Sequence, residues 1–395
     1  MRIRIGIDGS NMGTGGGATH LVEILRTLCP SRHDIAQITV WGGSHLLERI
    51  EPQEWLRLRS PDAVNGSLPL RLWWQQLRLE YEAEDCDVLF VPGGLYLGRF
   101  RPFVTMMQNM LPFAPRERAR FGFTLNRLRY HLLEWGQQKT FDNAAGTIFL
   151  TQTARNAVVE RHGSLDGRTN IVPHGVSERF ATEDHLNQSP VLNDEDSPFR
   201  WLYVSPIKLY KHQWTVVRAV SALREEGYSV ALDLVGGGEP RAMKKLRDAL
   251  RKTDRDGKAI RYHGRVSHQK IDDFYRNSDA FVFASTCETF GQVLTEAMQA
   301  GLPIACSSRS AAPEVVQDAA VHFDPEDLSE MIEAMRTIMD NSELRKRKAQ
   351  AGRNRVREFS WDRCARETFS FLTEVARRSE TGSDCTEVQS EKKIF

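Results

Sequence analysis

The sequence predicts an α/β protein with two domains, each a doubly wound parallel sheet. Short apolar runs alternate with amphipathic stretches along most of the 395 residues. A polar, acidic stretch with two prolines, residues 183–198, interrupts this alternation and is expected to link the domains. Strand–helix–strand repetition buries a parallel sheet beneath helices on both faces, and this chain is too long for one hydrophobic core.

Five apolar runs in the first half predict strands, because β-branched and aromatic residues dominate them and turn-forming residues bound them. These runs lie at 2–8, 36–42, 88–92, 102–107 and 146–151. Helical periodicity between them predicts helices at 18–28 and 68–83. We expect this half to form a domain at 1–190.

The second half repeats the pattern, with predicted strands at 200–205, 230–236, 259–264, 280–285 and 303–308. Helices are predicted at 212–227, 240–252 and 327–340. We expect a second domain at 196–358. The polar chain end, residues 381–395, is expected to be a disordered tail.

Composition excludes several classes of protein. A net charge of +1 gives no global field that would attract nucleic acid. The six cysteines form no CxxC pair, which argues against a zinc site or a disulfide framework and fits a reducing compartment. The first residues do not read as a secretory signal, and no stretch approaches the roughly eighteen apolar residues of a membrane span. We therefore expect a soluble cytoplasmic protein.

The stretch GTGGGATHL (13–21) follows the first predicted strand and opens a helix. Gly16 and Gly17 would let the backbone approach a ligand closely, and the helix start adds partial positive charge. The stretch is therefore a candidate phosphate cradle. It also matches a loose dinucleotide pattern, although the second strand lacks the terminal acid of such sites, and a turn without a ligand is a further alternative.

Two further strand ends carry candidate ligand groups. Lys208 and Lys211 follow the strand at 200–205, where a lysine can neutralise a diphosphate, although solvated loop lysines are common. Gly236 opens a glycine run at the end of the strand at 230–236, which predicts either a ligand pocket or a plain turn.

The stretch TDRDGK (253–258) holds two carboxylates, Asp254 and Asp256, in a spacing that some metal sites share. A charged turn that ends the preceding helix, with Gly257 as its stop, is the simpler interpretation, and we favour it.

Two acids, Glu288 and Glu296, flank the stretch ETFGQVLTE, which turns from a strand into a helix. On one helix they would lie about 12 Å apart along the axis, too far to share one metal ion. The helix start between them favours an anion such as a diphosphate, and each acid could then accept hydroxyls from a different sugar. This order predicts a nucleotide sugar. Stabilisation of the helix start by negative charge is the structural alternative.

The stretch AFVFASTCETFGQVLTEAMQAGLPIACSSRSAAPEV (280–315) closely resembles the C-terminal signature of glycosyltransferase family 4. Similar stretches extend over nearly the whole chain, among them VTMMQNMLPF (104–113), NIVPHGV (170–176) and YHGRVSHQKIDDFYRNSD (262–279). The resemblance implies a GT-B fold, which consists of two Rossmann-like domains with a ligand cleft between them. It also implies that a final helix, at 360–378, crosses back to the first domain.

The resemblance implies a role for each candidate site residue. Glu288 would contact the donor sugar, Glu296 the ribose and Lys211 the diphosphate, with Glu288 and Lys211 as the catalytic residues. The other donor contacts would come largely from backbone groups, of Gly16, Gly17, Val266, Phe290, Gly291, Gln292 and Val293.

The activity that the resemblance implies is a retaining transfer of a hexose, mannose being one candidate, from a GDP- or UDP-linked donor. The acceptor would be a glycan or a lipid-linked glycan, as in surface polysaccharide or lipopolysaccharide biosynthesis. No cofactor or metal is expected, and front-side attack needs no protein nucleophile. Two departures concern Ser205, where relatives carry an arginine that Lys208 is hypothesised to replace, and Gln108–Asn109, where many relatives carry His-Asp.

Segment 115–140 carries six Lys or Arg residues among leucines and aromatics. We expect an amphipathic helix that packs against the core. Contact with an anionic membrane, as a peripheral protein on its inner face, is the alternative. Segment 70–84 is expected to be another helix that covers the sheet.

An enzyme is the leading hypothesis. The alternative is a catalytically inactive glycosyltransferase-like partner or scaffold of a polysaccharide-building complex, which Ser205 keeps open. A nucleotide-sugar epimerase on the same architecture is disfavoured by the intact C-terminal signature, and no nucleic-acid partner is expected.

Overall fold

The computed structural model describes residues 2–13, 15–165, 167–182, 197–254 and 257–381. These residues form two compact units. The first unit comprises Met1–Phe113, Leu128–His174 and Trp361–Phe395, and the second comprises Ala114–Arg127 and Gly175–Ser360. The predicted linker and the predicted tail lie almost entirely outside the described residues.

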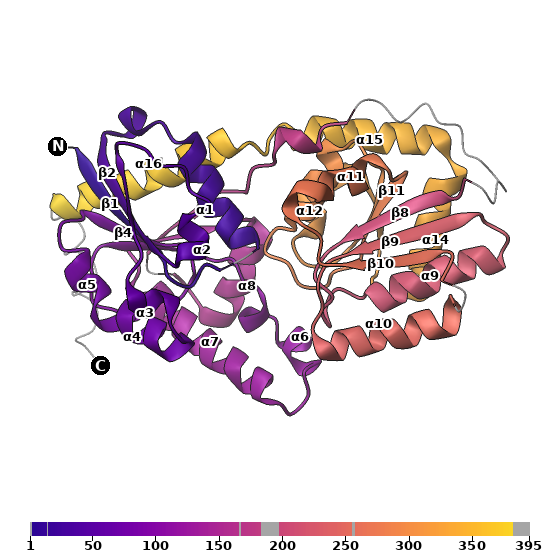
Figure 1. The fold of residues 1–395 in the computed structure, drawn as a ribbon, viewed down its shortest axis with the longest axis horizontal. Coiled ribbons are helices and arrows are strands. Elements are labelled where there is room, and N and C mark those ends of the chain that lie inside the picture. The colour runs from indigo at the N-terminus through magenta and orange to yellow at the C-terminus, as the bar shows by residue number, and fades with distance from the viewer. Residues whose placement is uncertain (1, 14, 166, 183–196, 255–256, 382–395) are drawn as a thin grey trace, which may run out of the picture. The chain divides into compact units, whose positions relative to one another are not determined.

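The first unit is built on a seven-stranded sheet in the order β3-β2-β1-β4-β5-β6-β7, and all neighbouring strands in it are parallel. Helices α1 and α16 pack on each other, and α16 contacts β1 and β4 (Figure 1). The strands are β1 Ile3–Gly9, β2 Ile35–Gly42, β3 Leu56–Arg59, β4 Val88–Val91, β5 Phe103–Met106, β6 Gly146–Phe149 and β7 Arg168–Ile171.

The helices of the first unit are α1 Gly16–Thr27, α2 Ser44–Leu47, α3 Asp62–Asn65, α4 Leu68–Leu77, α5 Leu79–Glu82, α7 Leu125–Asn143, α8 Gln152–His162 and α16 Trp361–Glu380, with short 3-10 turns η1 Pro30–His33 and η2 Leu111–Phe113. The predicted helix at 68–83 is thus two helices. The segment at 115–140 is also divided, because Gly122 takes a left-handed φ of 63° between α6 and α7.

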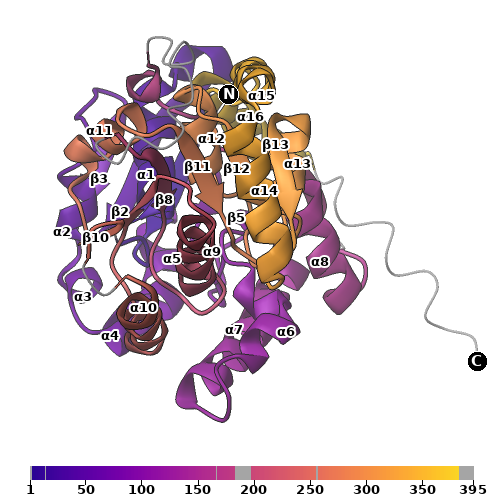
Figure 2. The ribbon, with the colours of Figure 1, turned by 90° about the vertical axis from the view of Figure 1, so that its right-hand side faces the viewer.

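The second unit is built on a six-stranded parallel sheet in the order β10-β9-β8-β11-β12-β13. Its strands are β8 Phe199–Val204, β9 Val230–Val235, β10 Ile260–Gly264, β11 Ala280–Phe283, β12 Ile304–Ser307 and β13 Ala320–Phe323. The helices α9 Gln213–Glu225, α10 Pro240–Thr253 and α14 Leu328–Asp340 cover one face (Figures 1 and 2).

The remaining helices of this unit are α6 Pro115–Ala119, α11 Ile271–Arg276, α12 Gln292–Gln299, α13 Ala312–Val316 and α15 Ser342–Val356, with 3-10 turns η3 Glu178–Phe180, η4 His268–Lys270 and η5 Gln317–Ala319. Of these, α11, α12 and α15 lie on the other face of the sheet in Figures 1 and 2. The parallel α/β class predicted from the sequence is therefore confirmed in both units.

The strands that sequence patterns missed, β3, β7 and β13, are the outer strands of their sheets. Each has four residues, and β3 and β13 each contain an exposed residue, whereas all four residues of β7 are half-buried. Edge strands with exposed polar side chains lack the continuous apolar run that identifies a central strand, which explains why they were missed.

Each sheet reverses its winding direction once. In the second unit the chain moves outward from β8 through β9 to β10 and then returns to β11, which pairs with β8. In the first unit the same reversal occurs between β1 and β4. The loops that leave the two strands at such a reversal run in opposite directions. The carboxyl ends of these two strands therefore border a crevice. These two switch points decide where polar side chains can gather.

Two segments group differently from the predicted domain boundaries. Residues 114–127 and 175–182 belong with the second unit, where the Arg120 guanidinium bonds Glu326 (2.8 Å) and the Thr182 hydroxyl donates to the Ala300 carbonyl (2.7 Å). Helix α16 packs on α1 in the first unit. Among the described residues, no helix combines the length and the apolarity needed to cross a bilayer.

Candidate functional site

Lys211 and Glu288 lie side by side at the switch point of the second unit. Lys211 follows β8 and Glu288 follows β11, the two strands that meet at the reversal. The Lys211 ammonium forms an ion pair with the Glu288 carboxylate, and the two side chains are only 9% and 15% exposed. The structure thus brings together the two residues that were predicted to be catalytic.

Backbone contacts hold both members of this pair in place. The Lys211 N–H donates to the Lys208 carbonyl (3.0 Å), and the Lys211 carbonyl accepts from the Tyr203 hydroxyl (2.6 Å). The Glu288 N–H donates to Ser310 Oγ (2.8 Å), and the Ser310 hydroxyl donates to the Glu288 carbonyl (2.9 Å). The chain is therefore anchored where each charged side chain leaves it.

The start of α12 follows Glu288 directly. Gly291 precedes the helix with a left-handed φ of 88°, and its carbonyl accepts from the Leu294 N–H at 2.8 Å. The first N–H groups of a helix have no partner within it, so partial positive charge gathers at this end. The Phe290 side chain is buried against Phe359, which leaves its backbone as the part that could meet a ligand.

Gln292 and Val293 form the first turn of α12, and both are half-buried. The Gln292 side-chain amide donates to the Gly175 carbonyl at 3.3 Å. That contact engages the Gln292 side-chain amide within the protein. The backbone of this turn, rather than its side chains, is therefore suited to an anion.

Glu296 lies in the second turn of α12, where its carboxylate accepts from the buried Tyr275 hydroxyl at 2.7 Å. Burial raises the pKa of Glu296 to about 7, although the Tyr275 hydrogen bond and the charge of Arg179 favour the ionised form. Near neutral pH the carboxyl therefore exists in both forms. A ligand hydroxyl that donates to Glu296 would stabilise the ionised one.

Gly236 lies where the ends of β8 and β9 come close together. A Cβ atom on it would be 2.1 Å from the Ser205 carbonyl oxygen, and its φ of 142° also favours glycine. Its N–H donates to the Gly264 carbonyl (2.7 Å), and its own carbonyl accepts from the Tyr262 hydroxyl (3.0 Å). Both backbone groups are thus engaged within the protein, and close packing explains this glycine.

The remaining predicted residues of the second unit flank the same strand ends. Lys208 forms an ion pair with Glu239 at 3.7 Å. Ser205 is buried, and its hydroxyl donates to the Pro206 carbonyl at 3.2 Å. Val266 is half-buried in the loop after β10. Their proposed contacts with a ligand stay predictions.

In the first unit, the predicted glycines lie at the start of α1. Gly15 precedes the helix with a φ of 105°, and Gly16 has open space where a Cβ would stand. A Cβ on Gly17 would lie 2.6 Å from Oε1 of Gln108. Gly17 therefore lets Gln108 approach the helix start.

Asp8, at the end of β1, is a buried acid that sequence reasoning did not single out. Its Oδ1 accepts from the Ser10 N–H at 3.0 Å, and its other oxygen accepts from the Gln75 amide. Burial raises the pKa of the Asp8 carboxyl. Acidic residues after strands are common, so only its burial distinguishes Asp8 from other acids. Burial can be seen in the structure but not in the sequence.

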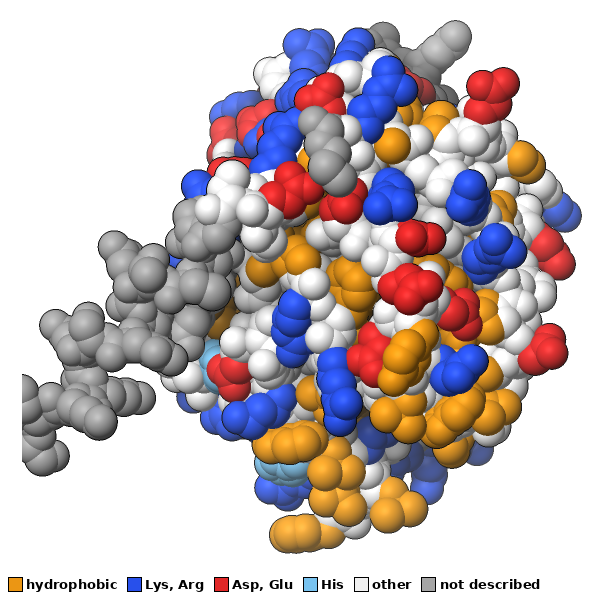
Figure 3. Space-filling view, turned by 90° about the vertical axis from the view of Figure 1, so that its left-hand side faces the viewer, with side chains coloured by type: hydrophobic (Ala, Val, Ile, Leu, Met, Phe, Trp, Pro, Cys, Tyr) orange, Lys and Arg blue, Asp and Glu red, His pale blue; other side chains and the backbone are white. Residues whose placement is uncertain are grey.

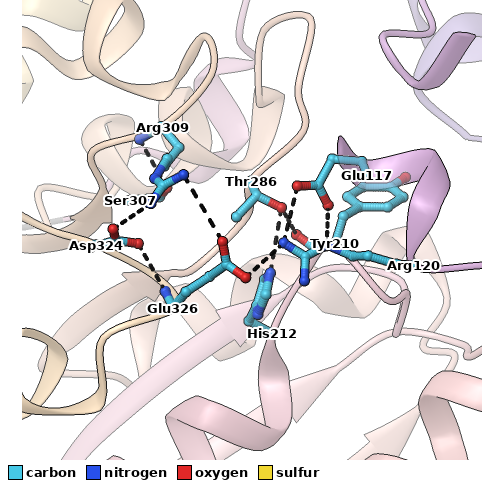
Figure 4. A network of polar contacts seen from close by, with 9 residues as sticks. All are labelled: Glu117, Arg120, Tyr210, His212, Thr286, Ser307, Arg309, Asp324 and Glu326. Carbon is cyan, nitrogen blue, oxygen red and sulfur yellow. Dashed lines mark hydrogen bonds and ion pairs between the residues drawn. The ribbon is translucent and has the colours of Figure 1, made fainter. Parts of the chain in front are cut away.

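A chain of alternating charges joins three distant segments of the second unit (Figure 4). Arg120 bonds Glu117 at 2.6 Å and Glu326 at 2.8 Å. Arg309 continues the chain, 3.9 Å from Glu326 and paired also with Asp324. The segment that carries α6 is thereby attached to the loops after β12 and β13.

His212, the neighbour of Lys211, faces this charged chain in Figure 4 and lies 3.4 Å from Thr286 Oγ1. Burial lowers the pKa of His212 to about 4, and the positive charge of Arg120 lowers it further. His212 is therefore neutral at physiological pH and adds no charge beside Lys211. Sequence spacing could not reveal this arrangement, because residues 117–120, His212 and residues 309–326 are far apart along the chain.

Asp254, from the possible metal motif, is already engaged. Its carboxylate accepts from the N–H groups of Ile260 (2.9 Å) and Ala259 (3.3 Å) and pairs with Arg224 (3.4 Å). It closes the turn before β10, which is the role that we favoured. Asp256 lies outside the described residues.

Among the described residues, one group of potential metal ligands comes within 4.8 Å, namely the buried His20, His174 and Cys364 of the first unit. The Nδ1 atoms of the two histidine rings are joined directly by a hydrogen bond of 3.0 Å. Burial lowers the pKa of both rings, that of His20 to about 3, so both are neutral. A hydrogen-bonded pair of neutral rings explains this geometry without an ion.

Two family models match consecutive parts of the chain. Residues 14–180 match the model described as Glycosyltransferase Family 4, and residues 185–355 match the model described as Glycosyl transferases group 1. The first match covers most of the seven-stranded sheet, and the second covers the Lys211–Glu288 pair and α12.

Curated relatives include the O-antigen chain mannosyltransferase B of Escherichia coli, which is 24% identical over 373 residues, or 90% of this chain and 95% of the relative. A D-inositol 3-phosphate glycosyltransferase of Xylanimonas cellulosilytica is 28% identical over 218 residues, or 54% of this chain and 50% of that relative.

Solved structures with the same fold include the sucrose-phosphate synthase of Thermosynechococcus elongatus, with a TM-score of 0.71 and 16% identity over 97% of this chain and 100% of that one. The HepE protein of Anabaena in complex with UDP-glucose has a TM-score of 0.69 and 16% identity over 96% and 100%. WaaG, a glycosyltransferase involved in lipopolysaccharide biosynthesis, has a TM-score of 0.67 and 15% identity over 94% and 100%. The predicted GT-B class of fold is thereby confirmed.

We predict that Gly236→Ala destabilises the protein by at least about 2 kcal/mol, because the new Cβ would meet backbone atoms at a positive φ. Gly237→Ala is the matched control, since the nearest atom to its Cβ would lie 3.4 Å away. Urea unfolding of both variants measures the difference. Equal stability of the two variants would contradict the packing role of Gly236.

We also predict that Glu296→Gln becomes increasingly stable relative to the wild type as pH rises from about 5 to about 8. In that window the folded carboxyl, with its pKa raised to about 7, retains a proton that the unfolded chain has lost, so wild-type stability falls as pH rises. Thermal unfolding across this range tests the sign. Tyr275→Phe is the control, because losing a donor to the carboxylate should raise the pKa of Glu296 further.

Proposed function

We propose that this chain, which belongs to glycosyltransferase family 4, is a retaining hexosyltransferase. Its donor is a nucleotide-diphosphate sugar. The observation that carries the proposal is the meeting of Lys211, Glu288 and the start of α12 at one switch point. The acceptor is a glycan or a lipid-linked glycan of a surface polysaccharide, and mannose is the first sugar to test. Similarity to the O-antigen mannosyltransferase over nearly the whole chain supports this choice.

The diphosphate binds at the start of α12 in this proposal. The N–H groups of residues 290–293 supply partial positive charge, and Lys211 adds a full charge. Because Lys211 already pairs with Glu288, the incoming diphosphate shares the ammonium instead of meeting an unpaired carboxylate. Lys208 is a second candidate cation, and Gly16 and Gly17 are the candidates from the first unit.

The two acids bind the sugars on either side of the diphosphate. Glu288 accepts hydroxyls of the donor hexose, whereas Glu296 accepts hydroxyls of the ribose in place of the Tyr275 hydroxyl or together with it. The backbone of Val266 meets the edge of the base. Each acid thus faces donors that a carboxylate can accept from, and neither faces the phosphate alone.

Transfer proceeds by front-side attack. The bond between the anomeric carbon and the leaving diphosphate oxygen breaks, and the acceptor oxygen bonds to the same carbon on the same face. The acceptor proton moves to the leaving phosphate, so no protein nucleophile is required. Lys211 and the helix start stabilise the negative charge that develops on the diphosphate, and a divalent metal is not needed.

The alternative function is that of a catalytically inactive partner in a polysaccharide-building complex. Ser205 favours it, because this buried serine stands where relatives carry a cation for the diphosphate. Donor hydrolysis and transfer assays separate the two functions. Saturation-transfer NMR with GDP-, UDP- and ADP-linked sugars identifies the donor in either case.

We further propose a cytoplasmic location, with peripheral contact at the inner face of a membrane. The five described cysteines are free, and two of them, Cys287 and Cys306, are buried. Cys287 directly precedes Glu288, and Cys306 lies in β12, which pairs with β11. Free thiols are typical of a reducing compartment.

We predict that Glu288→Gln lowers kcat by about tenfold or more and leaves donor affinity nearly unchanged, because Glu288 acts on the transferred sugar. Glu296→Ala should instead raise the donor KM and change kcat less, because the ribose contact is made equally in the ground and transition states. Steady-state kinetics with donor titrated at saturating acceptor measures both. Wild-type kinetics in both variants would remove these role assignments.

We predict that transfer continues at an unchanged rate after dialysis against EDTA, because Lys211 and the helix start supply the positive charge. Addition of Mg²⁺ or Mn²⁺ to the dialysed protein should not increase the rate. A rate that falls on chelation and returns with either cation would contradict the metal-independent mechanism.

A further inference from the structure

Ser310, in the loop after β12, has a backbone conformation that serine rarely adopts. Its φ is 60°, in the left-handed region, where an L side chain is strained and glycine is not. Among the described residues, the other non-glycine residues with a positive φ are Asp34, His212 and Gln317. Residues strained in this way persist where the surrounding structure determines their conformation, and they gather at functional sites. The side chain of Ser310 is therefore expected to contribute something that glycine could not.

The Ser310 hydroxyl bonds both backbone groups of Glu288. It accepts from the Glu288 N–H at 2.8 Å and donates to the Glu288 carbonyl at 2.9 Å. The N–H belongs to the peptide group before the Glu288 Cα atom, and the carbonyl belongs to the peptide group after it. Because each peptide group is planar, holding both of them fixes the direction in which the Glu288 side chain leaves the backbone. Neither alanine nor glycine has a side-chain atom that could replace these two bonds.

The residues on either side of Ser310 are fixed in turn. The Arg309 N–H donates to the buried Ser307 Oγ at 3.1 Å, and the Arg309 guanidinium belongs to the chain of alternating charges in Figure 4. Ala311, on the other side, is fully buried. Ser310 thus lies between a residue held by charge and a residue held by packing. A loop that is held on both sides can impose a conformation on the backbone of Glu288.

Lys211 is held by contacts that do not involve Ser310. Its carbonyl accepts from the Tyr203 hydroxyl at 2.6 Å, and the next residue, His212, is another of the strained residues, with a φ of 52°. Two of the four strained non-glycine residues among those described therefore adjoin the two members of the Lys211–Glu288 pair. Loss of the Ser310 hydroxyl should release Glu288 and leave the backbone of Lys211 in place.

We propose that Ser310 is a positioning residue, which directs the Glu288 carboxylate toward the transferred sugar. In this proposal Ser310 touches neither the donor nor the acceptor and acts only through Glu288. The proposal deepens the proposed transferase function and rests on it for the role of Glu288. The position of Glu288 relative to Lys211, however, is a property of the folded protein and can be measured without a substrate.

Steady-state kinetics tests the effect on transfer. Ser310→Ala should lower kcat by about tenfold and leave the donor KM nearly unchanged, because a misdirected carboxylate weakens the transition state more than the bound donor. The double variant Ser310→Ala/Glu288→Gln should be no slower than Glu288→Gln alone, because no carboxylate then remains to be positioned. Losses that multiply in the double variant would show that Ser310 does not act through Glu288 and would overturn the proposal.

A second substitution separates the hydroxyl from the backbone conformation. Ser310→Gly also lacks the hydroxyl, but glycine adopts a φ of 60° without strain. Ser310→Gly should therefore unfold at a higher urea concentration than Ser310→Ala and yet be equally slow in transfer. Wild-type kcat in Ser310→Gly, or activity that follows stability across the two variants, would give Ser310 a structural role only and contradict the proposal.

Ser308→Ala is the matched control in the same loop. Ser308 is exposed, and its backbone N–H, which alanine keeps, donates to the Phe323 carbonyl at 2.8 Å. This variant should have the kcat of the wild type. A similar loss of kcat in Ser308→Ala would mean that any change in the loop slows transfer, and the assignment to the Ser310 hydroxyl would then fail.

Urea unfolding tests the positioning without any substrate. The coupling between Lys211 and Glu288 is obtained from the stabilities of Lys211→Met, Glu288→Gln and their double variant. The coupling should fall by about half or more when the same cycle is built on Ser310→Ala, because the interaction of two charges weakens with distance. Equal coupling in the two backgrounds would overturn the proposal. If the wild type turned over none of the GDP-, UDP- or ADP-linked sugars, the proposed function would fail, and the coupling would still decide whether Ser310 positions Glu288.

Discussion

Burial of both faces of a parallel sheet is the constraint on which the candidate site depends. Helices that cover the faces leave the carboxyl edge as the place where polar groups can meet. In the second unit the winding reverses between β8 and β11, and the loops after these strands supply Lys211 and Glu288. In the first unit, Gly17 follows β1 and Gln108 follows β5, and the two residues lie against each other near the start of α1.

Internal contacts satisfy the charged groups of the site. Lys211 and Glu288 neutralise each other, the Tyr275 hydroxyl occupies the Glu296 carboxylate, and burial keeps His212 neutral. A diphosphate with sugars on both sides would replace each of these internal contacts with one of the same kind: cation to phosphate, and hydroxyl to carboxylate. Desolvated charges are costly when unpaired, which gives a physical reason why the charged groups of the site pair with each other.

Helix α7 buries polar side chains and exposes apolar ones. Its inward side satisfies polar groups through Arg161 and Tyr96, and its leucines are left to the solvent. Hydrophobic burial is thus incomplete within the first unit and becomes available to a partner. Hydrophobic side chains gather over the lower part of the side of the molecule that Figure 3 shows, with Lys and Arg among them. The expectation that segment 115–140 packs its apolar side against the core is therefore wrong for α7.

The sequence by itself determined the α/β class, the central strands, and the loop positions of Lys211, Glu288 and the α12 start, because strand and helix periodicities and glycine turns are local signals. Only the tertiary structure decided the edge strands β3, β7 and β13, the partners of Glu296 and Arg120, and the packing role of Gly236. These depend on residues that are distant along the chain. Periodicity likewise shows that α7 has two sides, but which side faces the core depends on the polar partners that Arg161 and Tyr96 provide.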